Sequence, residues 1–172
     1  METEFIVKSP ILGFEHITKM KLTKIDDIFL KLSNADEPLP CFTLVNPFSL
    51  CEYSFEIPSA IQVLLDLQEG KTQNILIANI MVVYKEITDS TINFIAPIVF
   101  NFDNGTMAQV VLDALKYPQY SIAEPISTFL KNNANGESND LNADSSESSG
   151  ESNNLGADSG ESSNSSESKG AK

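Results

Sequence analysis

The sequence predicts a small, mainly β (α+β) domain with one or two short helices, followed by a disordered acidic tail. Short runs with apolar residues at alternate positions recur between residues 5 and 112, and this period of two is typical of half-buried strands. From residue 132 onward the chain is almost entirely Asn, Ser, Glu, Asp, Gly and Ala. Such a composition cannot bury enough apolar surface to offset the entropy lost on ordering. We therefore expect a folded domain over residues 1–131 and a disordered tail over residues 132–172.

The first third of the chain predicts four short strands. They cover residues 5–8, 16–24, 28–32 and 42–45. Pro10 ends the first strand, and Gly13 marks a turn or a close approach of the backbone. A loop rich in turn formers separates the third strand from the fourth, which ends at Asn46-Pro47.

A fifth strand and a helix are expected next. Residues 53–57 alternate cleanly between apolar and polar side chains, which favours a strand. Ser59 followed by Gln62 has the spacing of a capping box, so a helix is expected to begin there. Apolar residues continue at helical spacing, and Gly70 is placed to end the helix in the left-handed region.

An antiparallel meander of three strands should follow. Its strands run from about 74 to 86, 91 to 102 and 106 to 112, with turns at Asp89-Ser90 and Asn104-Gly105. The first is apolar on both faces, as expected of a central covered strand, and Asn104-Gly105 is typical of a type I′ turn. Pro97 lies inside the second strand and cannot donate to a ladder. We therefore expect a bulge or bend at Ala96-Pro97, one way to curl a sheet toward a barrel.

The end of the folded part should form a short helix. It would open at Glu124-Pro125 and bury Ile126, Phe129 and Leu130. The tail then repeats a unit at residues 136–149 and 150–163, where eleven of fourteen positions are identical. With a single Leu in each unit no solenoid can be built, so the repeat predicts an expanded, solvated segment whose Ser-Glu-Ser runs favour solubility.

The charge of the chain excludes one class of partner and favours another. The net charge is −13, and residues 1–135 alone hold nine Lys against sixteen Asp and Glu, or −7. The sequence contains no Arg and no basic cluster, which argues against direct binding of nucleic acid. An acidic surface instead favours basic protein partners and speeds encounter with them.

The expected location is the cytoplasm. The N-terminus is acidic and lacks the apolar region of a secretion signal. No apolar run approaches the roughly 20 residues that a membrane helix needs, so no membrane association is expected. Cys41 and Cys51 are then expected to be reduced, partly buried thiols.

Little in the sequence points to catalysis or to a metal. His16 is the only histidine, and with two cysteines it falls short of a structural zinc set. Asp26-Asp27 could be half of a carboxylate pair, although turn duty is the more frequent role. Asparagines on or beside the apolar strands are expected to bond backbone groups at bends, since buried amides need partners. These are Asn46, Asn79, Asn93 and Asn101.

Three stretches of the chain resemble one known family. They read PILGFE at residues 10–15, VNPF at residues 45–48 and INFIAPIVFN at residues 92–101. Further similar stretches lie at residues 53–58, 106–112 and 117–118. In order and spacing they resemble the flagellar assembly factor FliW family, and the resemblance runs from about Val7 to Leu130. The repeated tail lies outside it.

The resemblance implies a small antiparallel β-barrel-like domain with no catalytic activity, and from the residues we expect no cofactor and no metal. It implies two cytoplasmic partners: flagellin and the translational regulator CsrA, a small RNA-binding dimer. Free FliW holds CsrA off the flagellin transcript, and unexported flagellin occupies FliW and releases CsrA. Flagellin translation would thereby be coupled to flagellin export, and we expect the free protein to be a monomer.

Two segments are candidates for the partner-binding surface. They contribute Asn46, Pro47, Phe48, Asn93, Phe94, Ala96 and Pro97. A role as fold determinants is equally compatible with these residue types. Two other interpretations remain open at this point: a flagellin chaperone without CsrA control, and an enzyme with a carboxylate site in a barrel mouth.

Overall fold

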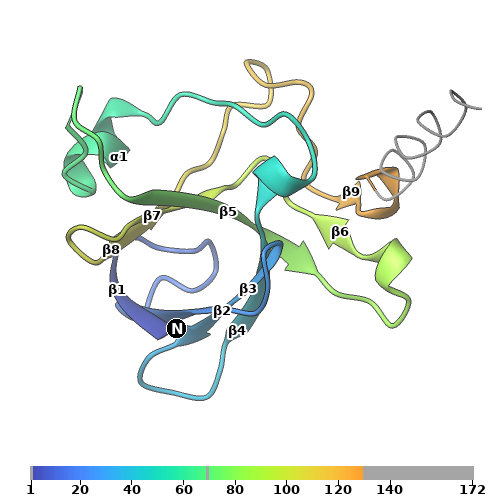
Figure 1. Ribbon diagram of the computed structural model, residues 1–172, viewed down its shortest axis with the longest axis horizontal. Helices are drawn as coiled ribbons and strands as arrows, with labels where there is room; N and C mark the ends of the chain where they lie inside the picture. The colour runs from blue at the N-terminus through green and yellow to red at the C-terminus, as the bar shows by residue number, and fades with distance from the viewer. Residues whose placement is uncertain (1, 69, 130–172) are drawn as a thin grey trace, which may run out of the picture. The chain divides into compact units, whose positions relative to one another are not determined.

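Seven strands of this protein close into a barrel because each pairs with a neighbour on both sides (Figure 1). The computed structural model describes residues 2–68 and 70–129. The barrel strands are β1 (Glu2–Ser9), β2 (Lys19–Lys24), β3 (Phe29–Asn34), β4 (Cys41–Val45), β5 (Ile75–Val82), β7 (Ile98–Asn101) and β8 (Thr106–Gln109). Their order is β4-β3-β2-β1-β8-β7-β5, and β4 also pairs with β5, which closes the ring. Only the β1–β8 pairing is parallel. The expected barrel is confirmed.

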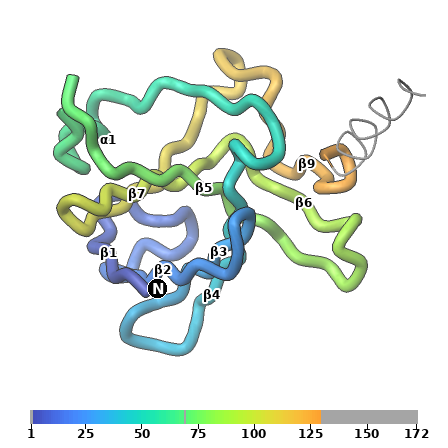
Figure 2. The backbone as a smooth tube through the Cα atoms, viewed as in Figure 1, coloured from blue at the N-terminus to red at the C-terminus, as the bar shows by residue number. Residues whose placement is uncertain are grey.

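The remaining elements lie outside this ring (Figure 2). The short strands β6 (Thr91–Ile92) and β9 (Glu124–Pro125) extend the sheet from the C-terminal end of β5. The 3₁₀ helices η1 (Pro47–Ser49) and η2 (Ile87–Asp89) and the α-helix α1 (Ser59–Leu64) occupy connections. No helix of the described ranges is long and apolar enough to cross a membrane.

The interior of the barrel is filled by the inward-facing side chains of the strands. The largest of these are Phe5, Met20, Leu32, Leu44, Ile98, Phe100 and Met107. The loop between β1 and β2 joins the same core, because Ile11 and Ile17 are buried in it and the ring of Phe14 lies 5.0 Å from that of Phe42. This explains the motif at residues 10–15: it packs one loop against the barrel core, and Gly13, at φ +86°, allows the turn.

A second core covers the outer face of β5, β7 and β8. It is formed where residues 50–67 and 110–129 pack over those strands, against outward side chains such as Ile77, Met81 and Val99. The expectation that β5 is covered on both sides holds for residues 75–81. Residues 82–89 are exposed, which is a difference from the predicted strand over residues 74–86. The boundary predicted at residues 131 and 132 and the repeated tail lie outside the described residues.

The meander is confirmed, and so is its break. β5 pairs with β7 and β7 with β8, both antiparallel. Residues 93–97 separate β6 from β7, and β8 continues past them through hydrogen bonds from Val110 N to Pro97 O and from Leu112 N to Ile95 O, both 2.8 Å. The turn at residues 102–105 has four residues, and of these only Gly105 has positive φ, at +65°. The type I′ turn was therefore wrong, because Asn101 pairs directly with Thr106 and leaves a longer loop.

The expected strand over residues 53–57 is absent, although its alternation is real. Tyr53 is buried, Phe55 and Ile57 are half-buried, and the polar residues between them are exposed. The segment has no strand partner because tyrosine hydroxyls take that role. Tyr120 Oη accepts from Ser54 N and donates to Ser54 O, both at 2.8 Å, and Tyr117 Oη accepts from Glu56 N at 3.0 Å.

The first helix is shorter than expected and is capped differently. It begins at Ser59, with Pro58 as the capping residue and no side-chain cap. Gln62 does reach back, but its Nε2 donates to Ile57 O. Asp66, at φ +53°, takes the left-handed position expected of Gly70, and Leu67 N donates to Gln62 O as the helix ends.

The predicted final helix also starts later. Residues 124–125 form β9, and the helical turn covers residues 127–129. Ile126 and Phe129 are buried as expected, while Leu130 lies outside the described residues.

The tyrosine anchor gives a stability prediction. Tyr120→Phe removes the hydroxyl that serves both backbone groups of Ser54, so the free energy of unfolding should fall by about 1–2 kcal/mol. Urea denaturation measures this. Tyr84→Phe is the matched control, because the Tyr84 side chain is 54% exposed and its hydroxyl bonds no group among the described residues. Equal stabilities of the two variants would contradict the anchor.

Candidate functional site

The two candidate segments meet at one tyrosine. Asn46 and η1 directly follow β4 in the chain, and residues 93–97 form the bend between β6 and β7. The ring of Tyr53 lies 6.1 Å from that of Phe48 and 5.5 Å from that of Phe94, measured between centroids. Its hydroxyl donates to Phe94 O at 2.7 Å. Tyr53 therefore couples the two segments, which are far apart in the sequence.

Asn79 supports this contact from within β5. It is fully buried, and its Nδ2 donates to Asn93 O at 2.8 Å and lies 3.4 Å from Tyr53 Oη. Within the described residues its Oδ1 has no partner. Burial raises the pKa of the Tyr53 phenol well above its usual range, so the hydroxyl keeps the proton that it donates to the bend.

Every carbonyl of the bend has a partner. The acceptors and their donors are Asn93 O with Asn79 Nδ2, Phe94 O with Tyr53 Oη, Ile95 O with Leu112 N, Ala96 O with Gln109 Nε2, and Pro97 O with Val110 N. Since none of these five groups belongs to a regular ladder, the bend is held by its side-chain and backbone donors. A segment held in this way has a fixed conformation.

Gln109 also ties the bend to the loop at residues 10–15. It is buried, and its Oε1 accepts from Leu12 N at 2.9 Å while its backbone carbonyl accepts from Ser9 Oγ at 3.1 Å. The longest of its bonds is that to Ala96 O, at 3.5 Å. Sequence reasoning missed Gln109 as part of the site. The available signal was a polar residue within the otherwise apolar run at residues 107–112.

Most of the predicted site residues shape the backbone. Pro47, Phe94, Ala96 and Pro97 are buried. Asn46 and Asn93 are half-buried, and the side-chain carbonyl of each accepts a backbone N–H two residues ahead, from Phe48 and Ile95. The expectation that these asparagines bond the backbone is thus confirmed, as it is for Asn79 and Asn101. Of the seven candidates, Phe48 alone is exposed, at 55%.

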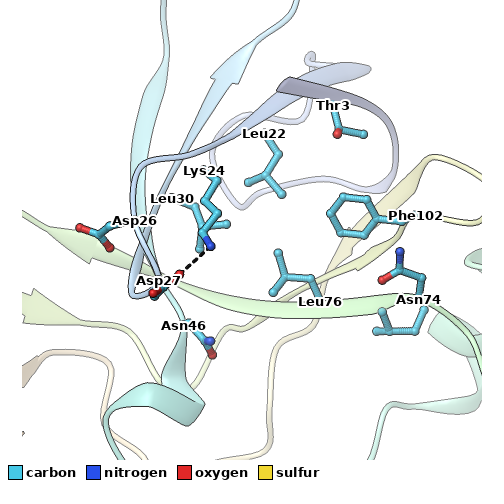
Figure 3. A pocket seen from close by; sticks show the side chains of 11 residues that line it. Thr3, Leu22, Lys24, Asp26, Asp27, Leu30, Asn46, Asn74, Leu76 and Phe102 are labelled. Carbon is cyan, nitrogen blue, oxygen red and sulfur yellow. Dashed lines mark hydrogen bonds and ion pairs between the residues drawn. The ribbon is translucent and has the colours of Figure 1, made fainter. Parts of the chain in front are cut away.

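A hollow of about 360 Å³ lies at one end of the barrel (Figure 3). Its walls are largely apolar, and they are formed by Leu22, Leu30, Ile75, Leu76 and Phe102. Asp26 and Asp27 lie at its mouth. Asp26 Oδ1 accepts from Ile28 N and Phe29 N, at 2.8 and 2.7 Å, and Asp27 pairs with Lys24 at 2.6 Å, a contact that lowers the pKa of the Asp27 carboxyl. These carboxylates serve a turn and an ion pair, as Asp in such a position usually does.

The other polar candidates are dispersed. His16 lies in an exposed turn before β2, Cys41 is exposed and Cys51 is half-buried, and both cysteines are free. Within residues 2–68 and 70–129 no three His, Cys, Asp or Glu side chains are grouped as metal ligands would be.

Comparison with known proteins gives a consistent result. The model of the FliW protein family matches residues 1–126. The chain is 56% identical over 131 residues to flagellar assembly factor FliW 2 of Wolinella succinogenes, covering 76% of this chain and 95% of that protein. It is 45% identical over 128 residues to flagellar assembly factor FliW of Sulfurimonas denitrificans, covering 74% and 98%.

A solved structure supports the same fold. The crystal structure of the flagellar assembly factor FliW superimposes with a TM-score of 0.64 at 23% identity, covering 72% of this chain and 84% of that chain. The family resemblance inferred from the motifs is confirmed by the sequence matches. Because these matches span most of the chain and nearly the full length of its relatives, the chain belongs to the FliW family of flagellar assembly factors.

Proposed function

We propose that this protein is a cytoplasmic binding protein that couples flagellin translation to flagellin export. It binds flagellin, and when flagellin is absent it binds CsrA and keeps it from the flagellin transcript. The proposal rests on membership in a family of flagellar assembly factors. It is non-catalytic, and it acts as a monomer that exchanges one partner for the other.

The acidity of the domain supports the CsrA half of this proposal. A protein that grips RNA phosphates is basic at its RNA-binding surface. Residues 1–135 carry a net charge of −7, so docking them near that surface makes the local potential less favourable to RNA, even where the RNA site stays uncovered. Inhibition then requires proximity of charge rather than a large change of shape in CsrA.

The rigid bend and η1 support the flagellin half. Terminal segments of flagellin are amphipathic helices in the filament, and an apolar surface suits such a helix. Phe48 offers one exposed aromatic ring, and the bend residues Asn93, Phe94, Ala96 and Pro97 fix the backbone beside it. In this proposal Asn46 and Pro47 position Phe48, which makes the direct contact.

The partner switch predicts competition. The full chain should bind purified CsrA and purified flagellin separately, and flagellin should displace CsrA in a titration monitored with labelled CsrA. Binding of flagellin without binding of CsrA would instead indicate a chaperone outside the regulatory circuit. A stable ternary complex would contradict the exchange.

The electrostatic argument predicts salt dependence. Raising ionic strength from about 0.05 to 0.5 M should weaken the CsrA complex, because the Debye length falls from roughly 14 to 4 Å. Isothermal titration calorimetry at each salt concentration gives the dissociation constants. An unchanged affinity for CsrA would contradict the role assigned to the acidic surface.

Phe48 predicts a specific loss of flagellin binding. Phe48→Ser should raise the dissociation constant for flagellin about tenfold or more, since an exposed aromatic side chain at an interface frequently dominates the binding energy. Its exposure means that stability to urea should change by less than about 1 kcal/mol. Leu115→Ser is the matched control, because Leu115 is 92% exposed and lies outside both candidate segments. Equal flagellin affinities of the two variants would remove Phe48 from the site.

A further inference from the structure

The connection from β5 to β6 carries apolar side chains that the fold does not use. We name the last residue of β5 and the connection that follows it, residues 82–89, the β5–β6 arm; all eight residues are exposed. Val82, Val83, Tyr84 and Ile87 are among them, each between 49% and 54% exposed. In Figure 1 the arm, with η2 within it, extends away from the barrel. Apolar side chains gathered on a projecting element typically mark a protein-binding surface.

The base of the arm is fixed by one buried residue. Ser90 is fully buried, and its Oγ accepts from Tyr84 N at 3.0 Å while its backbone carbonyl accepts from Ile126 N at 2.8 Å. Ser90 N donates to Ile87 O at 3.1 Å, which closes η2. The arm therefore begins and ends in hydrogen bonds to the folded domain, and its presented shape needs little ordering when a partner binds.

The charges of the arm identify the chemistry of its partner. The arm carries two acidic side chains, Glu86 and Asp89, and one basic side chain, Lys85. None of the ion pairs within the described ranges includes either carboxylate. A second copy of this chain would bring the same carboxylates against each other, which disfavours self-association through the arm. A partner surface with an apolar centre and a basic rim complements the arm.

We propose that the β5–β6 arm is the docking element for a basic, apolar-centred protein surface. The inference rests on the proposed function, within which this partner is CsrA. The arm leads through Ser90 and β6 into the bend, which begins at Asn93, directly after the last residue of β6. A partner on the arm and a partner beside the bend therefore occupy adjoining parts of one chain segment, and mutual exclusion follows from their overlap.

The apolar centre is tested with the full chain. The double variant Val83→Ser with Tyr84→Ser should bind CsrA at least about tenfold more weakly by calorimetry, since both side chains would lie in the interface centre. Leu115→Ser is the control and should bind CsrA as the unaltered chain does. Urea denaturation verifies that both variants fold, and flagellin affinity of the double variant should stay within about threefold.

The charged rim is tested by a matched pair of reversals. Glu86→Lys and Glu2→Lys change the net charge equally at two exposed positions, one in the arm and one on β1. Glu86→Lys should lower the affinity for CsrA more than Glu2→Lys does, and it should reduce the salt dependence of CsrA binding. Equal effects of the two reversals would overturn the charge argument for the arm.

The outcomes separate this inference from the proposed function. If the unaltered chain fails to bind CsrA, the proposed function fails and the assignment of the arm fails with it. If the unaltered chain binds CsrA and the double variant binds it equally well, the arm assignment alone is overturned. Loss of flagellin binding with CsrA binding retained would likewise overturn it, because the arm would then belong to the other partner's surface.

Discussion

The interrupted strand at residues 93–97 is the constraint on which the rest of the structure depends. Proline at position 97 removes a ladder donor, and the chain must leave the sheet there. Five consecutive carbonyls then need other donors, since an unpaired buried polar group costs about 1–3 kcal/mol. Tyr53, Asn79 and Gln109 supply three of them, and backbone amides supply two. These requirements explain why polar residues lie inside otherwise apolar strands.

The same interruption sets the positions of the candidate surfaces. Tyr53 joins the bend to the segment that carries Phe48, and the β5–β6 arm leads into the bend from the other side. Both surfaces are therefore mounted on one rigid region outside the barrel. In the proposed partner exchange this arrangement needs no conformational switch, because two partners that bind adjoining surfaces exclude each other sterically.

The sequence predicted the parts of the fold that follow from local patterns. Alternation located the barrel strands of the first third of the chain, a continuous apolar run located β5, and Pro97 located the bend. Alternation misassigned residues 53–57 as a strand. Their backbone groups bond the hydroxyls of Tyr117 and Tyr120, about sixty residues away in the sequence. Local pattern cannot distinguish a strand from an extended segment whose backbone is satisfied in this way.

The local pattern also could not predict which apolar residues are buried. Residues 75–84 are apolar apart from Asn79 and the hydroxyl of Tyr84, yet only residues 75–81 lie in the covered sheet, and the chain then projects into solvent. The candidate site residues were found as a motif, but their roles depend on which neighbours they meet. Phe48 is exposed while Phe94 is buried against Tyr53, and nothing in the two short motifs distinguishes these aromatics.

Hydrogen–deuterium exchange on the full chain, free and with each partner, tests the central claim most directly. The account predicts slow exchange of the bonded amides of the bend in the free protein, added protection of residues 82–89 with CsrA, and added protection around residues 46–50 with flagellin. Protection of the barrel strands β1 to β3 by both partners, with none in the arm or η1, would contradict it.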